Sequence, residues 1–365
     1  IKYYIVNDKH IYFLKVAHKL AEKKFGTTFP NPVVGCLIVK KNLIISKGVT
    51  ASQGRPHAEE IALRKAGDKA KGANMYVTLE PCFHKSNNGS CAEQILRSGI
   101  KELYIAKHDP DIRTNKKSIK KLKLNGIKVF SDLLQEETNE LNHFFFHSLK
   151  LKRPLIKVKM AISADEKIAR SNYQSKWISN SLSRAFSHTL RFKSQAILTT
   201  SKTIIKDNPR FTIRKRGKII KYIPTIIIDT DLKIPLNIKL LKDITKKRII
   251  IFTSSKGKKY DFLERLGCEV IFMKKNIKHQ MNLNTIFNKI YKLKINDLFV
   301  EAGGIFFTNL LKNKLVDELH LFRSSKFIGN TGKPVIIGKK ISDLNTKEIL
   351  RTKYGNDIYQ HLKII

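Results

Sequence analysis

The sequence predicts a protein of two α/β domains, and three observations support this. With 365 residues the chain exceeds the usual size of one hydrophobic core, so two domains of roughly 150 to 200 residues are expected. Helix-like amphipathic segments alternate with short apolar, strand-like runs along both halves of the chain. A basic segment over residues 150–154, which ends in a proline, interrupts this alternation near the middle. We therefore expect one domain over residues 1–150 and a second over residues 151–365.

The first domain is predicted to alternate helices and strands in a layered sheet. Glycines near the ends of two helix-like stretches, Gly99 and Gly126, can take the left-handed conformation that ends a helix before the next strand. In chain order the expected elements are a helix over 11–24, a strand over 35–40, a helix after Pro56, a strand over 75–79, a helix from Cys91, strands over 103–106 and 127–130, and an amphipathic helix over 133–149.

The second domain is predicted to be rich in β-strands with helices between several of them. The expected strands cover 155–160, 196–199, 223–228, 249–252, 270–272 and 298–300, and a helix follows over 306–315. The lysine-rich segment 214–221 is expected to be a mobile loop.

Composition and charge narrow the possible partners. The apolar fraction is 42%, but no uninterrupted apolar stretch reaches the ~20 residues of a bilayer span, so we expect no membrane partner. The N-terminal residues lack the apolar core of a signal peptide, which favours a cytoplasmic location. A net charge of +41 would attract nucleic acid, but the lysines are spread through every segment, which indicates biased codon usage and no specific nucleic-acid partner.

A cluster of metal-ligating residue types lies in the first domain. His57 and Glu59 stand two residues apart at the expected start of a helix. Cys82 follows the expected strand over 75–79, and Cys91 begins the next helix after a capping-box pattern. The helix dipole and free amides favour a thiolate at that position, which suits Cys91 to metal binding at neutral pH. Four cysteines in so long a chain favour metal ligation over a disulfide framework.

The metal predicted for His57, Cys82 and Cys91 is catalytic zinc. Three nitrogen and sulfur ligands leave the fourth tetrahedral position open for water, whose pKa the metal would lower. Glu59 is close enough to take a proton from that water and pass it to leaving ammonia, as a general acid/base in hydrolytic deamination. On the plainer interpretation, His57 caps a helix, the cysteines are packed thiols and Glu59 is a solvated carboxylate.

Two other functions share this zinc pattern. A nucleic-acid base deaminase would use the same residues and would benefit from the positive charge, but it leaves the C-terminal half unexplained. A non-enzymatic zinc-stapled nucleic-acid binder requires a fourth protein ligand, for which His84 is the nearest candidate.

A second cluster of functional residues is expected in the C-terminal domain. The apolar strand after Asp297 ends in Glu301-Ala302-Gly303-Gly304, and a helical run follows. Such a turn exposes backbone amides to a phosphate, although the adjacent glycines do not form the Gly-x-Gly-x-x-Gly pattern of dinucleotide sites.

The residues around the zinc cluster carry a specific resemblance. The segment Thr28-Phe29-Pro30-Asn31-Pro32-Val33-Val34-Gly35-Cys36 comes first, followed by His57-Ala58-Glu59 and Thr78-Leu79-Glu80-Pro81-Cys82-Phe83-His84 with Cys91. In order and in cysteine spacing this resembles the deaminase half of bifunctional riboflavin-biosynthesis proteins. The resemblance implies a cytidine-deaminase-like three-layer α/β/α domain, in which Asn31 contacts the pyrimidine and zinc chemistry replaces an exocyclic amino group of a diaminopyrimidinone.

The resemblance extends through the second half. Lys159-Met160-Ala161-Ile162-Ser163-Ala164-Asp165, Gln174-Ser175-Lys176-Trp177-Ile178, Asp207-Asn208-Pro209 and Glu301-Ala302-Gly303-Gly304 follow in the family's order. This implies a dihydrofolate-reductase-like α/β domain that uses NADPH to reduce the ribosyl group of the intermediate to ribityl. The implied NADPH-binding residues are Ile162, Trp177, Thr203, Asp207, Thr230, Gly303 and Gly304. The implied substrate-binding residues are Ser175, Arg191, Phe211, Arg214 and Glu301.

Three segments depart from the family pattern. Lys85-Ser86-Asn87-Asn88-Gly89-Ser90 replaces the usual loop between the cysteines, Glu166 stands at a glycine position, and Asn208 stands where a second aspartate is common.

The side chains of Arg191 and Arg214 carry forked donors, which suit the phosphate of a ribosyl group. The family further implies a phosphoribosyl-pyrimidine as the small-molecule substrate and a homo-oligomer, dimeric or larger.

Overall fold

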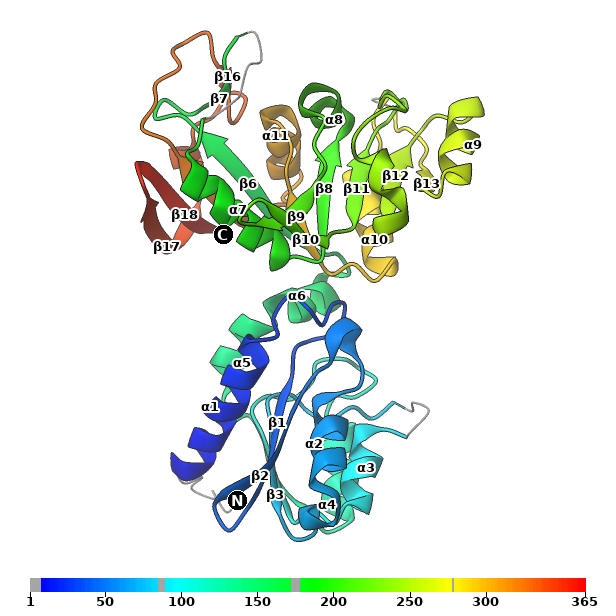
Figure 1. The fold of residues 1–365 in the computed structure, drawn as a ribbon, viewed down its shortest axis with the longest axis vertical. Coiled ribbons are helices and arrows are strands. Elements are labelled where there is room, and N and C mark those ends of the chain that lie inside the picture. The colour runs from blue at the N-terminus through cyan, green and yellow to red at the C-terminus, as the bar shows by residue number, and fades with distance from the viewer. Residues whose placement is uncertain (1–7, 85–88, 172–177, 278) are drawn as a thin grey trace. The chain divides into compact units, whose positions relative to one another are not determined.

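The computed structural model describes residues 8–84, 89–171, 178–277 and 279–365. The chain forms two compact units, Ile1–Leu151 and Lys152–Ile365, and each contains a sheet with helices on both faces (Figure 1). Among the described residues, no helix has the length and apolarity that a membrane crossing requires.

The first unit is organised around a five-stranded sheet with the order β2-β1-β3-β4-β5. Strand β1 is antiparallel to both neighbours, whereas β3, β4 and β5 are parallel. The strands are β1 (Gly35–Lys40), β2 (Leu43–Val49), β3 (Asn74–Val77), β4 (Glu102–Ile105) and β5 (Lys128–Phe130). The parallel arrangement aligns the carboxyl ends of β3 and β4 at one edge, and the segment that carries Cys82 leaves the sheet there.

Alternating side chains of these strands bury two hydrophobic layers. Leu37 and Val39 point to the face covered by α1, while Cys36 and Ile38 point to the face covered by α2, α3 and α4. The helices of this unit are α1 (Asp8–Glu22), α2 (Ala58–Ala66), α3 (Cys91–Arg97), α4 (Lys117–Leu124), α5 (Gln135–Leu141) and α6 (His143–Leu151). The prediction of a three-layer α/β/α domain is therefore confirmed.

The helix expected over 133–149 is two helices, so that prediction is wrong. Helices α5 and α6 are separated at Asn142, whose side chain is fully buried. The Asn142 amide accepts a hydrogen bond from the Val33 N–H at 2.8 Å and donates one to the Val33 carbonyl at 3.0 Å. Asn142 thus provides hydrogen-bond partners for both the N–H and the carbonyl of Val33, which lies just before β1 and outside the sheet.

The second unit contains a nine-stranded sheet with the order β13-β12-β11-β8-β14-β6-β15-β18-β17. The first seven strands in this order are parallel, and β18 and β17 extend the sheet in antiparallel fashion. The strands of this sheet are β6 (Leu155–Ile162), β8 (Ala196–Thr200), β11 (Thr225–Ile228), β12 (Ile249–Thr253), β13 (Glu269–Phe272), β14 (Asp297–Val300), β15 (Glu318–Arg323), β17 (Thr346–Tyr354) and β18 (Asp357–Ile364). Two short pairs lie outside it: β7 (Lys167–Ala169) with β16 (Lys333–Pro334), and β9 (Thr212–Lys215) with β10 (Lys218–Tyr222).

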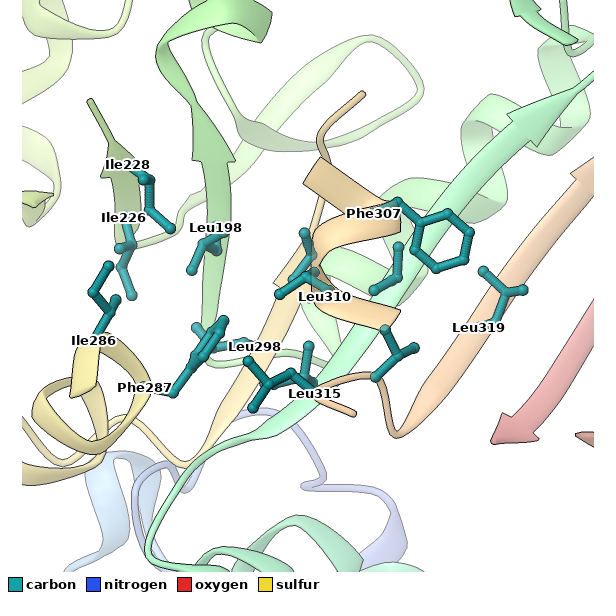
Figure 2. Packing of buried hydrophobic residues seen from close by; sticks show 14 of the residues in the cluster. Leu198, Ile226, Ile228, Ile286, Phe287, Leu298, Phe307, Leu310, Leu315 and Leu319 are labelled. Atoms are coloured by element: carbon teal, nitrogen blue, oxygen red, sulfur yellow. The ribbon is translucent and has the colours of Figure 1, made fainter. Parts of the chain in front are cut away.

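Helices bury both faces of this sheet. Figure 2 shows Phe287 of α10 and Phe307 and Leu310 of α11 packed against strand residues such as Leu198 and Leu298. The opposite face packs against Leu190 of α7, Ile204 of α8 and Leu263 of α9. The helices of this unit are α7 (Ser181–Phe192), α8 (Ser201–Asp207), α9 (Lys258–Arg265), α10 (Leu283–Lys292) and α11 (Gly304–Lys312). The expectation of a second α/β domain with a dihydrofolate-reductase-like fold is confirmed.

The lysine-rich segment expected to be a mobile loop is a β-hairpin. Strands β9 and β10 are antiparallel, and Lys215 pairs with Lys218 next to the turn. The two turn residues, Arg216 and Gly217, both have positive φ, at 49° and 78°. Two positive φ values in a two-residue turn match the twist of antiparallel strands. The prediction of a mobile loop rested on the lysine content of the segment. It overlooked Ile213 and Ile219, which give each of the two strands an apolar position.

Candidate active sites

Two helix N-termini and the end of one strand bring the three predicted zinc ligands together. His57 is the residue before α2 and has extended backbone angles, so Pro56 precedes the helix instead of lying in its first turn. Cys82 follows the end of β3, and Cys91 is the first residue of α3. Ser90 and Glu93 form the reciprocal capping box that the sequence predicted, which fixes where α3 begins.

The geometry of these side chains fits a bound zinc ion. One ligand atom from each of His57, Cys82 and Cys91 lies within 4.8 Å of the other two, and His57 Nδ1 is 3.3 Å from Cys91 Sγ. Zinc with bonds of about 2.0 to 2.3 Å in tetrahedral geometry places its ligand atoms roughly 3.3 to 3.8 Å apart. The Cys91 N–H also donates to Cys82 Sγ at 3.3 Å, a hydrogen bond that holds this sulfur in place.

The His84 side chain is not part of this group. Among the described residues, only His57, Cys82 and Cys91 meet at this point with ligand atoms mutually within 4.8 Å. His84 Nδ1 is buried without a hydrogen-bond partner in the described part of the chain. A closed four-ligand structural site, which the zinc-stapled binder requires, therefore lacks its fourth ligand here.

The two cysteines differ in their preference for the thiolate. A hydrogen bond from the Cys91 thiol, assisted by His57, lowers the pKa of Cys82 despite its burial. The pKa of Cys91 is raised, because its thiol donates to Cys82, because it is buried and because Glu59 is close. Without a metal ion, these contacts favour the thiolate at Cys82 over Cys91, although Cys91 lies at a helix N-terminus.

Glu59 is buried beside the ligands, with only 4% of its surface exposed. Burial raises the pKa of Glu59, although the nearby His57 acts in the opposite direction. Burial alone would lower the pKa of His57, but its hydrogen bond with Cys82 and the charge of Glu59 raise it overall. A raised pKa makes the Glu59 carboxylate a stronger base, which suits general acid/base chemistry.

Asn31 contacts Gly54, which precedes the predicted ligand His57 by three residues in the sequence. Its side-chain amide donates to the Gly54 carbonyl at 3.0 Å, and its side chain is half-buried. Gly54 has a φ of 88°, and a Cβ there would lie 2.5 Å from Asn31 Nδ2. The close approach of this glycine fixes the orientation of the predicted pyrimidine contact.

A buried carboxylate that the sequence analysis did not select organises the loop after β4. Glu80 accepts hydrogen bonds from the Asp109 N–H at 3.1 Å, the Lys116 N–H at 3.0 Å and the Ser118 hydroxyl at 2.6 Å. Because Glu80 precedes the predicted metal ligand Cys82 by two residues, its hydrogen bonds hold this loop near the segment that carries Cys82. Its position in the Glu80-Pro81-Cys82 motif could have marked Glu80 as a functional residue from the sequence.

Three of the predicted NADPH-binding residues, Ile162, Thr203 and Thr230, lie at or just after the carboxyl ends of strands in the second unit. Strands β6, β8, β14 and β11 are neighbours and parallel, so their carboxyl ends share an edge. Ile162 ends β6, Thr203 lies in the first turn of α8 after β8, and Thr230 follows β11. Asp207 is the last residue of α8. In open parallel sheets, ligands bind outside this edge where the strand order reverses, which here is beside β14.

Two glycines after β14 have different roles. Gly303 is the residue before α11, and a Cβ there would meet no atom within 4 Å. Gly304 is the first helical residue, and its Cβ would lie 2.6 Å from the Pro334 carbonyl oxygen. Gly303 therefore leaves room for a ligand at the amide end of α11, whereas Gly304 allows α11 to pack against the chain.

Among the predicted substrate residues, Arg191 forms a buried ion pair with Glu301 and lies over the ring of Phe211. Arg191 donates from Nε and Nη2 to the two carboxylate oxygens of Glu301, at 2.5 and 2.8 Å, and from Nη1 to the Thr212 carbonyl. The Phe211 ring lies 5.8 Å from the Arg191 guanidinium. Arg214, on β9, donates from Nε to the Thr212 hydroxyl at 3.2 Å. The forked donors of Arg191 are thus engaged within the protein.

Two further ionisable groups surround this pair and were missed from the sequence. Burial lowers the pKa of Lys159, while the charge of Glu301 acts in the opposite direction. Burial and the charge of Arg191 lower the pKa of His188, whose Nδ1 accepts a hydrogen bond from the Arg214 N–H at 3.2 Å. Lys157 and Lys159 lie two residues apart in the otherwise apolar strand β6, so they share one face of it. Lysines are rarely buried in such a strand, and this pattern could have identified Lys159 from the sequence.

At two of the positions that depart from the family pattern, Glu166 and Asn208, the backbone has a positive φ. Glu166 has a φ of 59°, in the region that favours glycine, and its carboxylate accepts from Arg323 at 3.1 Å and from the Ile341 N–H at 3.0 Å. Asn208 ends α8 with a φ of 42°, which asparagine tolerates well. Residues 85–88 of the changed loop lie outside the described residues, as do the predicted contacts Ser175 and Trp177.

Comparison with known proteins places both units in one family. Residues 154–359 match the family model of the RibD C-terminal domain, and residues 7–107 match the cytidine and deoxycytidylate deaminase zinc-binding region. The riboflavin biosynthesis protein RibD of Aquifex aeolicus is 37% identical over 343 residues, covering 92% of this chain and 91% of the relative. That of Escherichia coli is 31% identical over 328 residues, covering 87% and 88%.

Solved structures agree over the full length. Acinetobacter baumannii RibD superposes with a TM-score of 0.88 at 27% identity, covering 98% of this chain and 99% of the other. A Thermotoga maritima protein described as a diaminohydroxyphosphoribosylaminopyrimidine deaminase/5-amino-6-(5-phosphoribosylamino)uracil reductase gives 0.83 at 30% identity with the same coverage. From these matches and the deaminase and reductase units described above, we conclude that this chain belongs to the RibD family of bifunctional riboflavin-biosynthesis enzymes.

Proposed function

We propose that unit Ile1–Leu151 is the deaminase and unit Lys152–Ile365 the reductase, and that both act on one phosphoribosyl-pyrimidine. The first would hydrolyse an amino group from 2,5-diamino-6-hydroxy-4-(5-phosphoribosylamino)pyrimidine. The second would reduce the ribosyl group of the resulting aminouracil to a ribityl chain. The Thermotoga maritima relative, a deaminase and reductase of these two compounds by its name, supports both substrates. The observation that carries the proposal is the meeting of three zinc-ligand side chains beside the buried Glu59.

In the deaminase unit, His57, Cys82 and Cys91 hold zinc, which supplies the Lewis acidity that makes water a nucleophile near neutral pH. Glu59 takes a proton at its carboxylate and delivers it to the departing nitrogen, so that water is consumed and ammonia released. The raised pKa of Glu59, caused first by burial, allows the carboxyl group to keep that proton between the two transfers. Asn31 holds the pyrimidine in place.

In the reductase unit, the edge formed by β6, β8, β14 and β11 holds NADPH, which supplies the hydride. Ile162, Thr203, Asp207 and Thr230 position the cofactor, and the open space at Gly303 receives a phosphate at the amide end of α11. The pair of Arg191 and Glu301, with Phe211, forms a rigid wall that orients the ribosyl group of the substrate. Ser175 and Trp177 complete this proposed set.

A nucleic-acid base deaminase is the less favoured function. It would use the same zinc ligands, but it assigns no role to the C-terminal unit, where residues 154–359 match the RibD C-terminal domain. We further propose a homo-oligomer, a dimer or larger assembly, located in the cytoplasm where NADPH is available as a reductant. Analytical ultracentrifugation of the purified chain tests the assembly.

The proposed role of Glu59 is tested by the variant Glu59→Gln. We expect ammonia release from the diaminopyrimidine phosphate to fall by about 10²- to 10⁴-fold, because the amide cannot transfer the proton. Bound zinc, measured by atomic absorption, should stay at the wild-type ratio, and NADPH oxidation with the aminouracil phosphate as substrate should be unchanged. Glu60→Gln, the next residue of α2, is the matched control. Unchanged ammonia release by Glu59→Gln would rule out the assignment.

A further inference from the structure

Two histidines and a glutamate meet on strands β15 and β18 of the second unit, apart from the residues assigned above. Glu318 and His320 are two residues apart on β15, so their side chains point to the same face of the sheet. His361 of β18 pairs directly with His320 across the antiparallel strands. Opposite residues of such a pair have Cβ atoms about 4.5 to 5.5 Å apart, so the three side chains converge. One ligand atom from each lies within 4.8 Å of the other two.

The distances within this group, called here the strand cluster, fit one bound metal ion. Glu318 Oε2 is 3.0 Å from His361 Nε2 and 3.6 Å from His320 Nε2. A zinc ion with bonds of about 2.0 to 2.1 Å to nitrogen and oxygen holds its ligand atoms roughly 3.0 to 3.5 Å apart. The carboxylate oxygen therefore lies near both imidazole nitrogens at close to the spacing that shared coordination requires.

A buried nitrogen of His320 is the observation that points most directly to a ligand. The His320 side chain is only 5% exposed, and its Nε2 has no hydrogen-bond partner within the described parts of the chain. The other ring nitrogen, Nδ1, forms a 2.8 Å hydrogen bond with the Tyr359 hydroxyl. When Nδ1–H donates to this hydroxyl oxygen, Nε2 carries a lone pair, and a metal ion would supply its missing partner.

The protonation of His320 also suits a cation. Burial lowers the pKa of His320 to about 4, so its imidazole is neutral at neutral pH, and the neutral form is the one that binds metals. Lys157 lies opposite Glu318 on the neighbouring strand β6, but its Nζ is 2.7 Å from the buried Asp297 carboxylate, which balances its charge. The strand cluster therefore offers a neutral imidazole and a carboxylate to a metal ion.

The strand cluster is accessible from the side of His361. The side chains of His361 and Glu318 are 22% and 14% exposed. The rings of His320 and His361 are nearly parallel, with centroids 4.5 Å apart and an angle of 16° between them. Because a metal ion lies close to the plane of an imidazole that binds it, one ring has to turn. Tyr359 holds the buried His320, so the more exposed His361 turns about its Cβ–Cγ bond.

The strand cluster lies away from the edge of the sheet proposed to hold NADPH. In the parallel pair of β6 and β15, Glu318 is opposite Lys157, and Arg323 is opposite Ile162 at the carboxyl end. At about 3.3 Å per residue, Glu318 is roughly 16 Å along the sheet from Ile162. A metal ion at the strand cluster would therefore join β15 to β18 without contacting the cofactor.

We propose that Glu318, His320 and His361 form a second metal site, which binds zinc and ties β15 to β18. Two imidazoles and a carboxylate are ligands that zinc accepts, and water would fill the fourth position. The site lacks the thiolates of the deaminase site, so it holds zinc less tightly. Dialysed protein therefore keeps about one zinc per chain and binds the second ion reversibly.

Calorimetric titration of zinc chloride into the full-length protein that already carries its first zinc tests this site. Wild-type protein should bind about one further zinc per chain. We expect His361→Gln and Glu318→Gln each to weaken that binding more than tenfold, because each removes a ligand. Tyr359→Phe should weaken it by about tenfold, because it removes only the hydrogen bond that orients His320.

The matched control is His18→Gln, the same substitution at a partly exposed histidine of the first unit. It should bind the second zinc as wild type does. Zinc should also raise the melting temperature of wild type and of His18→Gln, but not that of His361→Gln, since the ion joins two strands of the folded state. Circular dichroism without added zinc reports whether each variant is folded.

Two outcomes would overturn the inference. One is wild-type protein that binds no zinc beyond the first ion, which needs no variant to fold. The other is equal binding by His18→Gln and His361→Gln, which would place the second ion elsewhere on the chain. Neither measurement uses ammonia release or NADPH oxidation, so the proposed function stands or fails separately.

Discussion

Burial raises the pKa of two carboxyl groups in the first unit, Glu59 and Asp109. Asp109, in the loop that Glu80 fastens, is only 8% exposed. Its burial raises the pKa of Asp109 to about 7, with the charges of Asp111 and Glu80 adding to the effect and the Asp111 N–H opposing it. In the unfolded chain this carboxyl group has a pKa near 3.8. The folded state therefore binds more protons than the unfolded state between these two values.

This difference predicts how stability depends on pH. As pH rises from about 4 through 7, Asp109 must ionise in a buried position, so the free energy of unfolding falls. Asp109→Asn removes this cost, and we expect its gain in unfolding free energy over wild type to be roughly 1 to 3 kcal/mol larger at pH 8 than at pH 5. Urea denaturation of zinc-loaded protein at both pH values measures it. An equal difference at the two pH values would show that Asp109 is not the titrating group.

At the scale of residues, the sequence predicted which side chains form the candidate zinc site, but it did not predict which side chains pair with one another. The motif spacing located His57, Cys82, Cys91 and Glu59, which meet in the structure as expected. The ion pair of Arg191 with Glu301 joins residues 110 positions apart, so no local pattern reveals it. The different pKa directions of Cys82 and Cys91 follow from which sulfur accepts hydrogen bonds, and the sequence does not reveal this geometry.

At the scale of elements, the two glycines before and within α11 allow a matched comparison. Gly304→Ala places a Cβ 2.6 Å from the Pro334 carbonyl oxygen, and we expect a loss of about 1 to 3 kcal/mol in unfolding free energy. Gly303→Ala meets no protein atom within 4 Å and has a φ of −76°, so stability should change by less than about 0.5 kcal/mol. Its added methyl group should instead raise the KM for NADPH. Thermal unfolding and cofactor titration check both variants, and equal destabilisation by the two would contradict this account.

Elements with a clear apolar pattern were predicted well, and those without one were missed. Strand β1 has the predicted bounds because five of its six residues are buried. Strand β17 is exposed over almost its whole length, so its sequence lacks the alternation that a half-buried strand shows. The break between α5 and α6 depends on Asn142 bonding to Val33, a contact across more than a hundred residues. Long-range hydrogen bonds of this kind are invisible in a local window.

At the scale of the whole molecule, each unit has hydrophobic clusters of its own. In the first unit these lie on the two faces of the five-stranded sheet, and in the second on the two faces of the nine-stranded sheet. A unit with its own core can fold independently. We therefore expect fragments 1–151 and 152–365, produced separately, each to unfold in one cooperative transition. The first should release ammonia and the second should oxidise NADPH, while an insoluble or inactive fragment would show that the two activities depend on the intact chain.

The most direct test of the account is a coupled assay on the purified full-length chain with measured zinc content. The diaminopyrimidine phosphate and NADPH are supplied together, and ammonia release and NADPH oxidation are followed separately. The account predicts about one zinc per chain, ammonia release that precedes NADPH oxidation, and oxidation without delay when the aminouracil phosphate is supplied instead. Zinc-loaded protein that neither releases ammonia nor oxidises NADPH would contradict it.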